Sequence, residues 1–110
     1  MTQTDALTPV FAALADPHRR QILDWLRISP ATVGDLTVRL PLSQPGVTKH
    51  LGVLERAGLI HRRAEGRTRV CELSDRGFRA AEEWMSGHRR FWDSALDKLA
   101  DLAEEPVVDD

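Results

Sequence analysis

The sequence predicts a single, mainly α-helical domain, residues 1–110, that carries one small β-hairpin. Apolar residues recur at helical spacings of three and four through most of the chain. Between residues 59 and 73 the pattern changes to two short runs of β-branched and apolar residues on either side of a glycine. A chain of 110 residues, 42% of them hydrophobic, fits one compact domain.

Two helices are expected first, over residues 6–15 and 17–28. Asp16 followed by Pro17 marks the start of the second helix, because an aspartate can accept a free backbone N–H and proline has none to lose. Ser29 and Pro30 end it. The first helix has its apolar residues at Leu7, Val10, Phe11 and Leu14, and the second at Ile22, Leu23 and Leu26.

A helix-turn-helix is expected over residues 33–57. Thr32 and Asp35 have the spacing of a capping box and start a short helix over about 33–40. Pro41 ends that helix, and Ser43 is an N-cap candidate for the next one, which should end where Gly58 can adopt a left-handed conformation. Two helices joined by so short a turn are typical of this motif.

The second helix of this motif has an apolar face and an unusual outward face. Val47, Leu51 and Leu54 share the inward face, whereas Gly46 and Gly52 each cost about 1 kcal/mol of helix propensity relative to alanine. Small outward residues allow a helix to enter a DNA major groove. The expected contacts of this helix are Ser43, Gln44, Pro45, Thr48, Lys49 and Arg56, with His50, nearer the inward face, as a secondary one.

A basic hairpin, or wing, is expected over residues 59–74 with its turn at Ala64, Glu65 and Gly66. Residues 43–70 hold six basic and two acidic residues, a net charge of +4, whereas residues 93–110 hold one basic and seven acidic residues, a net charge of −6. The hairpin could follow the phosphate backbone or enter the minor groove, or be an ordinary solvated turn. Its basic residues are Arg62, Arg63, Arg67 and Arg69.

One long helix is expected over residues 75–104, with a frayed tail over 105–110. Ser74 and Asp75 can cap it, and its apolar residues follow a heptad pattern too wide for a small domain to cover, so a partner chain should meet it. The residues of this face include Phe78, Met85, His88, Trp92, Leu96 and Leu99, with Trp84 and Phe91 beside them.

Three segments together resemble the ArsR-type winged helix-turn-helix regulators: LADPHRRQIL from Leu14, LSQPGVTKHLGVLERAGLI from Leu42, and the wing EGRTRV. The resemblance spans residues 7–74. It implies a homodimer whose first and last helices form the interface, which adds Leu7, Val10 and Phe11 to the interface residues. It also implies repression from a near-palindromic operator at the protein's own or a neighbouring promoter, and in many members release of DNA by a metal or other effector.

The metal-sensing members carry paired cysteines on the third helix, where this chain has TVGDL from Thr32. His88 could join carboxylates of two chains at a zinc ion, but a packed interface histidine is the favoured interpretation. We therefore expect no metal and no cofactor. The single cysteine, Cys71, is expected to point inward and stay protonated.

The remaining expectations concern activity and location. The sequence has no phosphate-binding glycine loop and no nucleophile motif, so an enzyme is not expected. Without a long apolar run or a signal-peptide pattern, the chain is expected to be soluble and cytoplasmic. A sequence-specific DNA-binding repressor is the main prediction. The alternatives are a metal- or ligand-sensing derepressor and a winged-helix protein-interaction module that binds no DNA.

Overall fold

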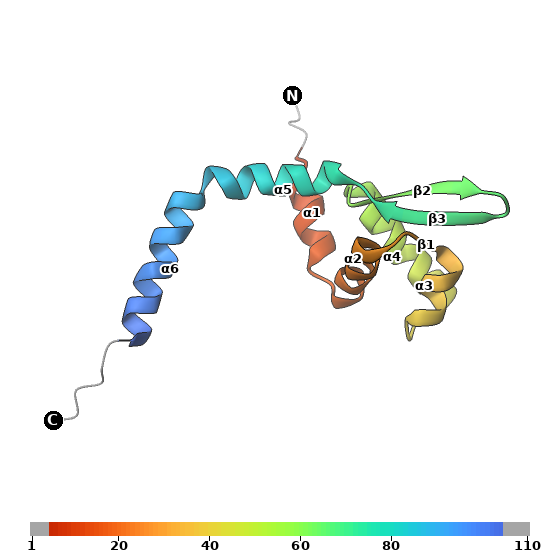
Figure 1. Ribbon diagram of the computed structural model, residues 1–110, viewed down its shortest axis with the longest axis horizontal. Helices are drawn as coiled ribbons and strands as arrows, with labels where there is room; N and C mark the ends of the chain where they lie inside the picture. The colour runs from red at the N-terminus through yellow and green to blue at the C-terminus, as the bar shows by residue number, and fades with distance from the viewer. Residues whose placement is uncertain (1–4, 105–110) are drawn as a thin grey trace.

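The computed structural model describes residues 5–104. It contains six helices and a three-stranded antiparallel sheet within that range (Figure 1). In chain order the elements are α1 (Leu7–Leu14), α2 (Pro17–Ile28), β1 (Ala31–Thr32), α3 (Val33–Arg39), α4 (Gln44–Arg56), β2 (Ile60–Glu65), β3 (Thr68–Leu73), α5 (Asp75–Gly87) and α6 (Arg89–Glu104). The tail predicted over 105–110 lies outside the described residues. No helix within the described range is both long and apolar enough to span a membrane.

The predicted helix starts are confirmed by their side-chain caps. Oδ1 of Asp16 accepts the backbone N–H groups of His18, at 2.8 Å, and Arg19, at 3.1 Å, and Pro17 is the first residue of α2. Thr32 and Asp35 form the capping box of α3, with a distance of 3.0 Å between the backbone nitrogen of Asp35 and Oγ1 of Thr32. These caps satisfy N–H groups that the first turn of a helix leaves free.

Helix α4 ends in a Schellman motif around Gly58, where the sequence predicted a left-handed glycine. Gly58 has a φ of 76°, and the backbone N–H of Leu59 binds the carbonyl of Leu54 at 3.0 Å. Gly77 of α5 packs against this turn so closely that a Cβ atom there would stand 2.5 Å from the carbonyl oxygen of Ala57. The turn after α4 therefore also fixes the start of α5.

The sheet has the strand order β1-β3-β2, and two of its features differ from the prediction. The hairpin register pairs Glu65 with Thr68, so the turn is Gly66 and Arg67, and Ala64 and Glu65 belong to β2. The predicted turn at residues 64–66 was wrong, because the two-residue turn uses the left-handed conformation of Gly66. Strand β1, which pairs with Val70 and Cys71 of β3, was not predicted.

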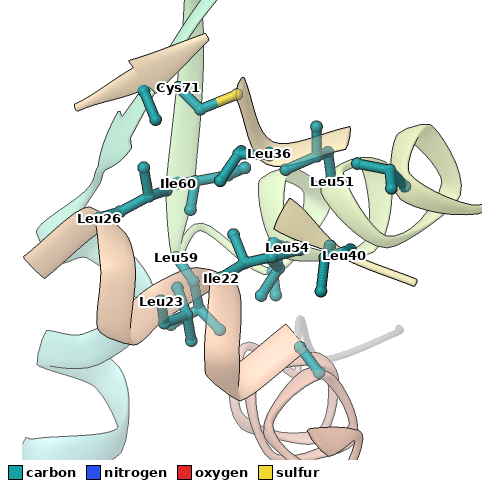
Figure 2. Packing of buried hydrophobic residues seen from close by; sticks show 14 of the residues in the cluster. Ile22, Leu23, Leu26, Leu36, Leu40, Leu51, Leu54, Leu59, Ile60 and Cys71 are labelled. Atoms are coloured by element: carbon teal, nitrogen blue, oxygen red, sulfur yellow. The ribbon is translucent and has the colours of Figure 1, made fainter. Parts of the chain in front are cut away.

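The hydrophobic core lies between α2, α3, α4 and the sheet (Figure 2). Leu51 and Leu54 of α4 are fully buried in it, as the inward face predicted, and so is Cys71. Burial raises the pKa of the Cys71 thiol, which keeps it protonated as expected. The core residues drawn in Figure 2 include Ile22, Leu23, Leu26, Leu36, Leu40, Leu59 and Ile60.

The prediction of one continuous helix over 75–104 was wrong. The chain breaks at His88, whose φ and ψ of −112° and 9° are not helical, and α6 leaves α5 at an angle (Figure 1). Nδ1 of His88 lies 2.8 Å from the carbonyl oxygen of Trp84, the carbonyl that the His88 backbone N–H would bind in a continuous helix. Gly87, a weak helix former, precedes the break.

Candidate nucleic-acid interface

Helix α4 presents one polar face to solvent while its other face is locked into the core. Val47, Leu51 and Leu54 are fully buried, which fixes the rotation of the helix about its own axis. The side chains that this rotation leaves exposed are Gln44, Pro45, Thr48, Lys49 and Arg56, and Ser43 is exposed just before the helix. The structure thus gathers the predicted α4 contacts, His50 excepted, in the solvent-exposed part of one helix.

The two glycines of α4 have different local reasons. A Cβ atom on Gly46 would stand 3.3 Å from Oγ of Ser43, the atom that caps the helix by accepting the Gly46 backbone N–H at 3.2 Å. A Cβ atom on Gly52 would meet only the guanidinium of Arg56, at 3.1 Å. Gly46 therefore serves the cap, whereas at Gly52 the flexible Arg56 side chain could move aside and the fold tolerates a larger residue.

Arg62 of the wing is held by a carboxylate of α4. Its Nη2 atom lies 2.8 Å from Oε1 of Glu55, and its side chain is only 18% exposed. The hydrogen bond to Arg62 holds the pKa of Glu55 below its ordinary value. Arg62 therefore ties the wing to α4, and its contact with phosphate stays a prediction.

The other wing arginines differ in how freely their charges face solvent. Arg63 bonds to Glu65, two residues further along the same strand, and its Nε atom lies 3.3 Å from Oε1 of Glu72 on the neighbouring strand. Arg67 and Arg69 are exposed, and no carboxylate between residues 5 and 104 is within ion-pair distance of them. Arg67 sits in the turn at the tip of the wing. The structure therefore presents Arg67 and Arg69 as the free cations of the hairpin.

His50 lies behind the polar face of α4, as its predicted inward position implied. Nη1 of Arg19 is 3.2 Å from Nδ1 of His50, and the His18 ring stands 5.9 Å from the His50 ring between centroids. Burial is the main cause that lowers the pKa of His50, so the ring is neutral at neutral pH. Asp16 completes a group of three residues whose possible metal-ligating atoms lie within 4.8 Å of one another.

Arg19 and Arg20 have structural roles that the sequence prediction missed. Nε of Arg19 donates to the carbonyl of Ala13 at 2.8 Å, and Nη1 of Arg20 donates to the carbonyl of Leu14 at 2.6 Å. Both arginines thereby cap the C-terminal end of α1. Basic residues shortly after a helix end are a known capping signal and could have suggested this role.

The predicted interface residues on α1, α5 and α6 divide into covered and exposed ones. Val10 is fully buried in the core of its own chain, so its assignment to a dimer interface was wrong: a partner could cover nothing more of it. Leu7 and Phe78 are half-buried. The exposed residues are Phe11, Met85, His88, Trp92, Leu96 and Leu99. A groove lined by Phe11, Phe78, Trp84, Met85, Trp92 and Leu96 runs along this surface.

Comparison with known proteins gives a consistent result. Residues 14–63 match a helix-turn-helix domain family. The HTH-type transcriptional regulator Rv2034 of Mycobacterium tuberculosis is 40% identical over 92 residues, which cover 84% of this chain and 83% of that protein. The transcriptional repressor SdpR of Bacillus subtilis is 33% identical over 76 residues, covering 69% of this chain and 84% of that protein.

Two further similarities extend the comparison. The transcriptional activator HlyU of Vibrio cholerae is 38% identical over 79 residues, covering 72% of this chain and 71% of that protein. The crystal structure of an ArsR family transcriptional regulator superposes with a TM-score of 0.75 at 37% identity, covering 86% of this chain and 98% of that chain. The fold is thus shared with a solved ArsR family regulator over most of both chains. The chain belongs to the ArsR-type family of winged helix-turn-helix transcriptional regulators.

Proposed function

We propose that the protein represses transcription by binding a near-palindromic operator as a homodimer, at its own or a neighbouring promoter. The observation that carries this proposal is the solvent-exposed polar part of α4 beside a wing with unpaired arginines. The family is one of transcriptional regulators rather than enzymes. We further propose that it acts in the cytoplasm, where the promoter is and where Cys71 stays reduced.

Base reading is assigned to the N-terminal half of α4. Gln44, Thr48 and Lys49 are exposed on this segment, and amide, hydroxyl and ammonium groups can each bind base edges in a major groove. Ser43, Pro45 and Arg56 would lie against the sugar-phosphate backbone, together with Arg63, Arg67 and Arg69 of the wing. His50, held behind the helix by Arg19, would act by supporting α4 rather than by touching a base.

The second copy of the chain is proposed to cover the exposed apolar surface of α1, α5 and α6. None of the α6 residues is buried, and that helix extends away from the body of the domain (Figure 1). Phe11 and Trp84 pack edge to face, 6.1 Å between ring centroids, and both remain about 40% exposed. Apolar surface of this extent on one protomer is typical of an interface.

The same two-fold axis would set the two α4 helices one turn of DNA apart, about 34–36 Å. Repression is proposed rather than activation because an operator-bound dimer blocks polymerase without needing a further contact. The similarity to the repressor SdpR supports repression, whereas the similarity to HlyU is a precedent for activation.

Selection of bound sequences from a random duplex pool tests the proposal. We expect a site with two-fold symmetry and half-sites about ten base pairs apart. Lys49→Ala should weaken binding to that site much more than to unrelated duplex, since base contacts carry specificity. A reporter gene behind the selected site should be expressed less when the protein is present. An enriched site without symmetry would refute the dimer, no enrichment would refute DNA recognition, and raised reporter expression would refute repression.

A further inference from the structure

A histidine of α4 meets two side chains at the start of α2. Asp16 is the N-cap of α2, His18 is in its first turn, and His50 comes from the middle of α4. One possible ligand atom from each residue lies within 4.8 Å of the other two, and all three residues are half-buried. Neither the DNA-binding face of α4 nor the apolar surface of α5 and α6 contains this cluster.

The donor set matches the ligands that Zn²⁺ binds in proteins. Two imidazole nitrogens and one carboxylate oxygen supply three protein ligands, which leaves a fourth tetrahedral position for water. With bonds of about 2.0–2.1 Å, tetrahedral ligand atoms stand about 3.4 Å apart. The atoms of the cluster are at most 4.8 Å apart, so each pair has to approach by no more than about 1.4 Å to reach that spacing.

The carboxylate of Asp16 has an oxygen available for this role. Both backbone N–H groups that it caps, those of His18 and Arg19, bind Oδ1. Within residues 5–104 no hydrogen bond to Oδ2 is found. Asp16 can therefore keep the start of α2 in place with one oxygen while it binds a metal with the other.

Arg19 is the group that competes with a metal for His50. A guanidinium has only donors, so Nη1 of Arg19, at 3.2 Å, must donate to a lone pair on Nδ1 of His50. A neutral imidazole has one such lone pair, so His50 can serve Arg19 or a metal but not both. Arg19 would stay anchored after losing His50, because Nε and Nη2 bind the carbonyls of Ala13, at 2.8 Å, and Ala12, at 3.0 Å.

We propose that Asp16, His18 and His50 form a Zn²⁺ site that joins the start of α2 to the recognition helix α4, with water as the fourth ligand and the metal replacing Arg19 as the partner of His50. The sequence prediction of no metal considered Thr32–Leu36 and His88, and neither belongs to this cluster. Metal bonds would take the place of the Arg19–His50 hydrogen bond between α2 and α4, and because the site exists only in the folded chain, metal binding should also raise the melting temperature.

The test uses the full chain without a purification tag, and it needs no DNA, so its outcome is separate from that of the proposed function. Co²⁺ is titrated as a spectroscopic probe, and Zn²⁺ is then added. We expect one equivalent of Co²⁺ per chain, with the strong visible absorption of a four-coordinate ion, and complete displacement by Zn²⁺. Absence of saturable binding, or a weak spectrum like that of hydrated Co²⁺, would overturn the proposal.

Variants identify the ligands. His18→Ala and Asp16→Asn should each raise the Zn²⁺ dissociation constant about tenfold or more, and asparagine keeps the helix cap so that the fold is retained. His61→Ala and His88→Ala remove the two imidazoles of this chain that lie outside the cluster, and both should leave the constant unchanged. His50→Asn is compared only if its circular dichroism matches that of the native chain. Unchanged affinity in both His18→Ala and Asp16→Asn, or loss in a control variant, would refute the site.

Discussion

Replacing Arg67 with alanine should make DNA binding less sensitive to salt. Arg67 stands in the turn at the tip of the wing, exposed and without an acidic partner in the described chain. If it meets a phosphate, its removal eliminates one counterion release per subunit, hence two per dimer. The slope of log K against log salt concentration should then become shallower by about 1.8, since each phosphate contact contributes about 0.9.

The size of this effect can be measured over an ordinary salt range. Between 50 and 200 mM salt, a difference of 1.8 in slope means that the native protein should lose about twelvefold more affinity than the variant. Fluorescence anisotropy with a labelled operator duplex, repeated with an unrelated duplex, gives both slopes. The affinity that Arg67→Ala loses relative to the native protein should be alike on the two duplexes, because a phosphate contact carries no sequence information.

A matched arginine variant separates contact from charge. Arg79→Ala removes the same charge from α5, where the side chain is 75% exposed and pairs with Asp75, so the slope should not change. Equal slopes for the native protein and Arg67→Ala would refute the phosphate contact, and a slope change in Arg79→Ala would show a general charge effect instead.

Three further outcomes are expected. Gly52→Leu should fold, since its new side chain would displace only the end of Arg56, but bind the operator at least about tenfold more weakly by blocking close approach to the groove; native-like affinity would contradict that role. Leu51→Ala should lower the free energy of unfolding by about 2–5 kcal/mol in urea denaturation, because Leu51 is fully buried; a loss under 1 kcal/mol would argue against this packing. Glu55→Gln should flatten the acid side of the curve of unfolding free energy against pH. The pKa of Glu55 is lower in the folded chain than its ordinary value of 4.5, so the ionised carboxylate adds stability above pH 4.5, and this stability is lost as the pH falls through the folded-state pKa. The loss should stay under about 1 kcal/mol, since the Glu55 side chain is 38% exposed, and an unchanged profile in the variant would refute the assignment.

Local signals predicted much of the fold because helix ends depend on nearby residues. The caps at Asp16, Thr32 and Ser43 each use a side chain within three residues of the N–H it binds. The left-handed turn at Gly58 is equally local. These features place the helix-turn-helix and, through the 3.6-residue period, divide α4 into a buried face and an exposed one.

Long-range pairings could not be predicted in the same way. Strand β1 has only two residues, too few to show the alternation of apolar and polar residues that predicts a strand. It forms because the edge of β3 is available for pairing beside it. The wing arginines looked equivalent in the sequence, yet Glu55 of α4 pairs with Arg62 and leaves Arg67 free. Which cations face solvent was decided by the packing of the hairpin against α4.

The sequence by itself determined the helices that precede the wing, their caps and the face that α4 turns outward, since all of these follow from contacts between near neighbours. The tertiary structure alone decided that Val10 belongs to the core and that His50 meets Asp16 and His18. The physical reason is the same in each case: these outcomes depend on which distant surfaces pack together, and side-chain spacing along the chain does not specify that.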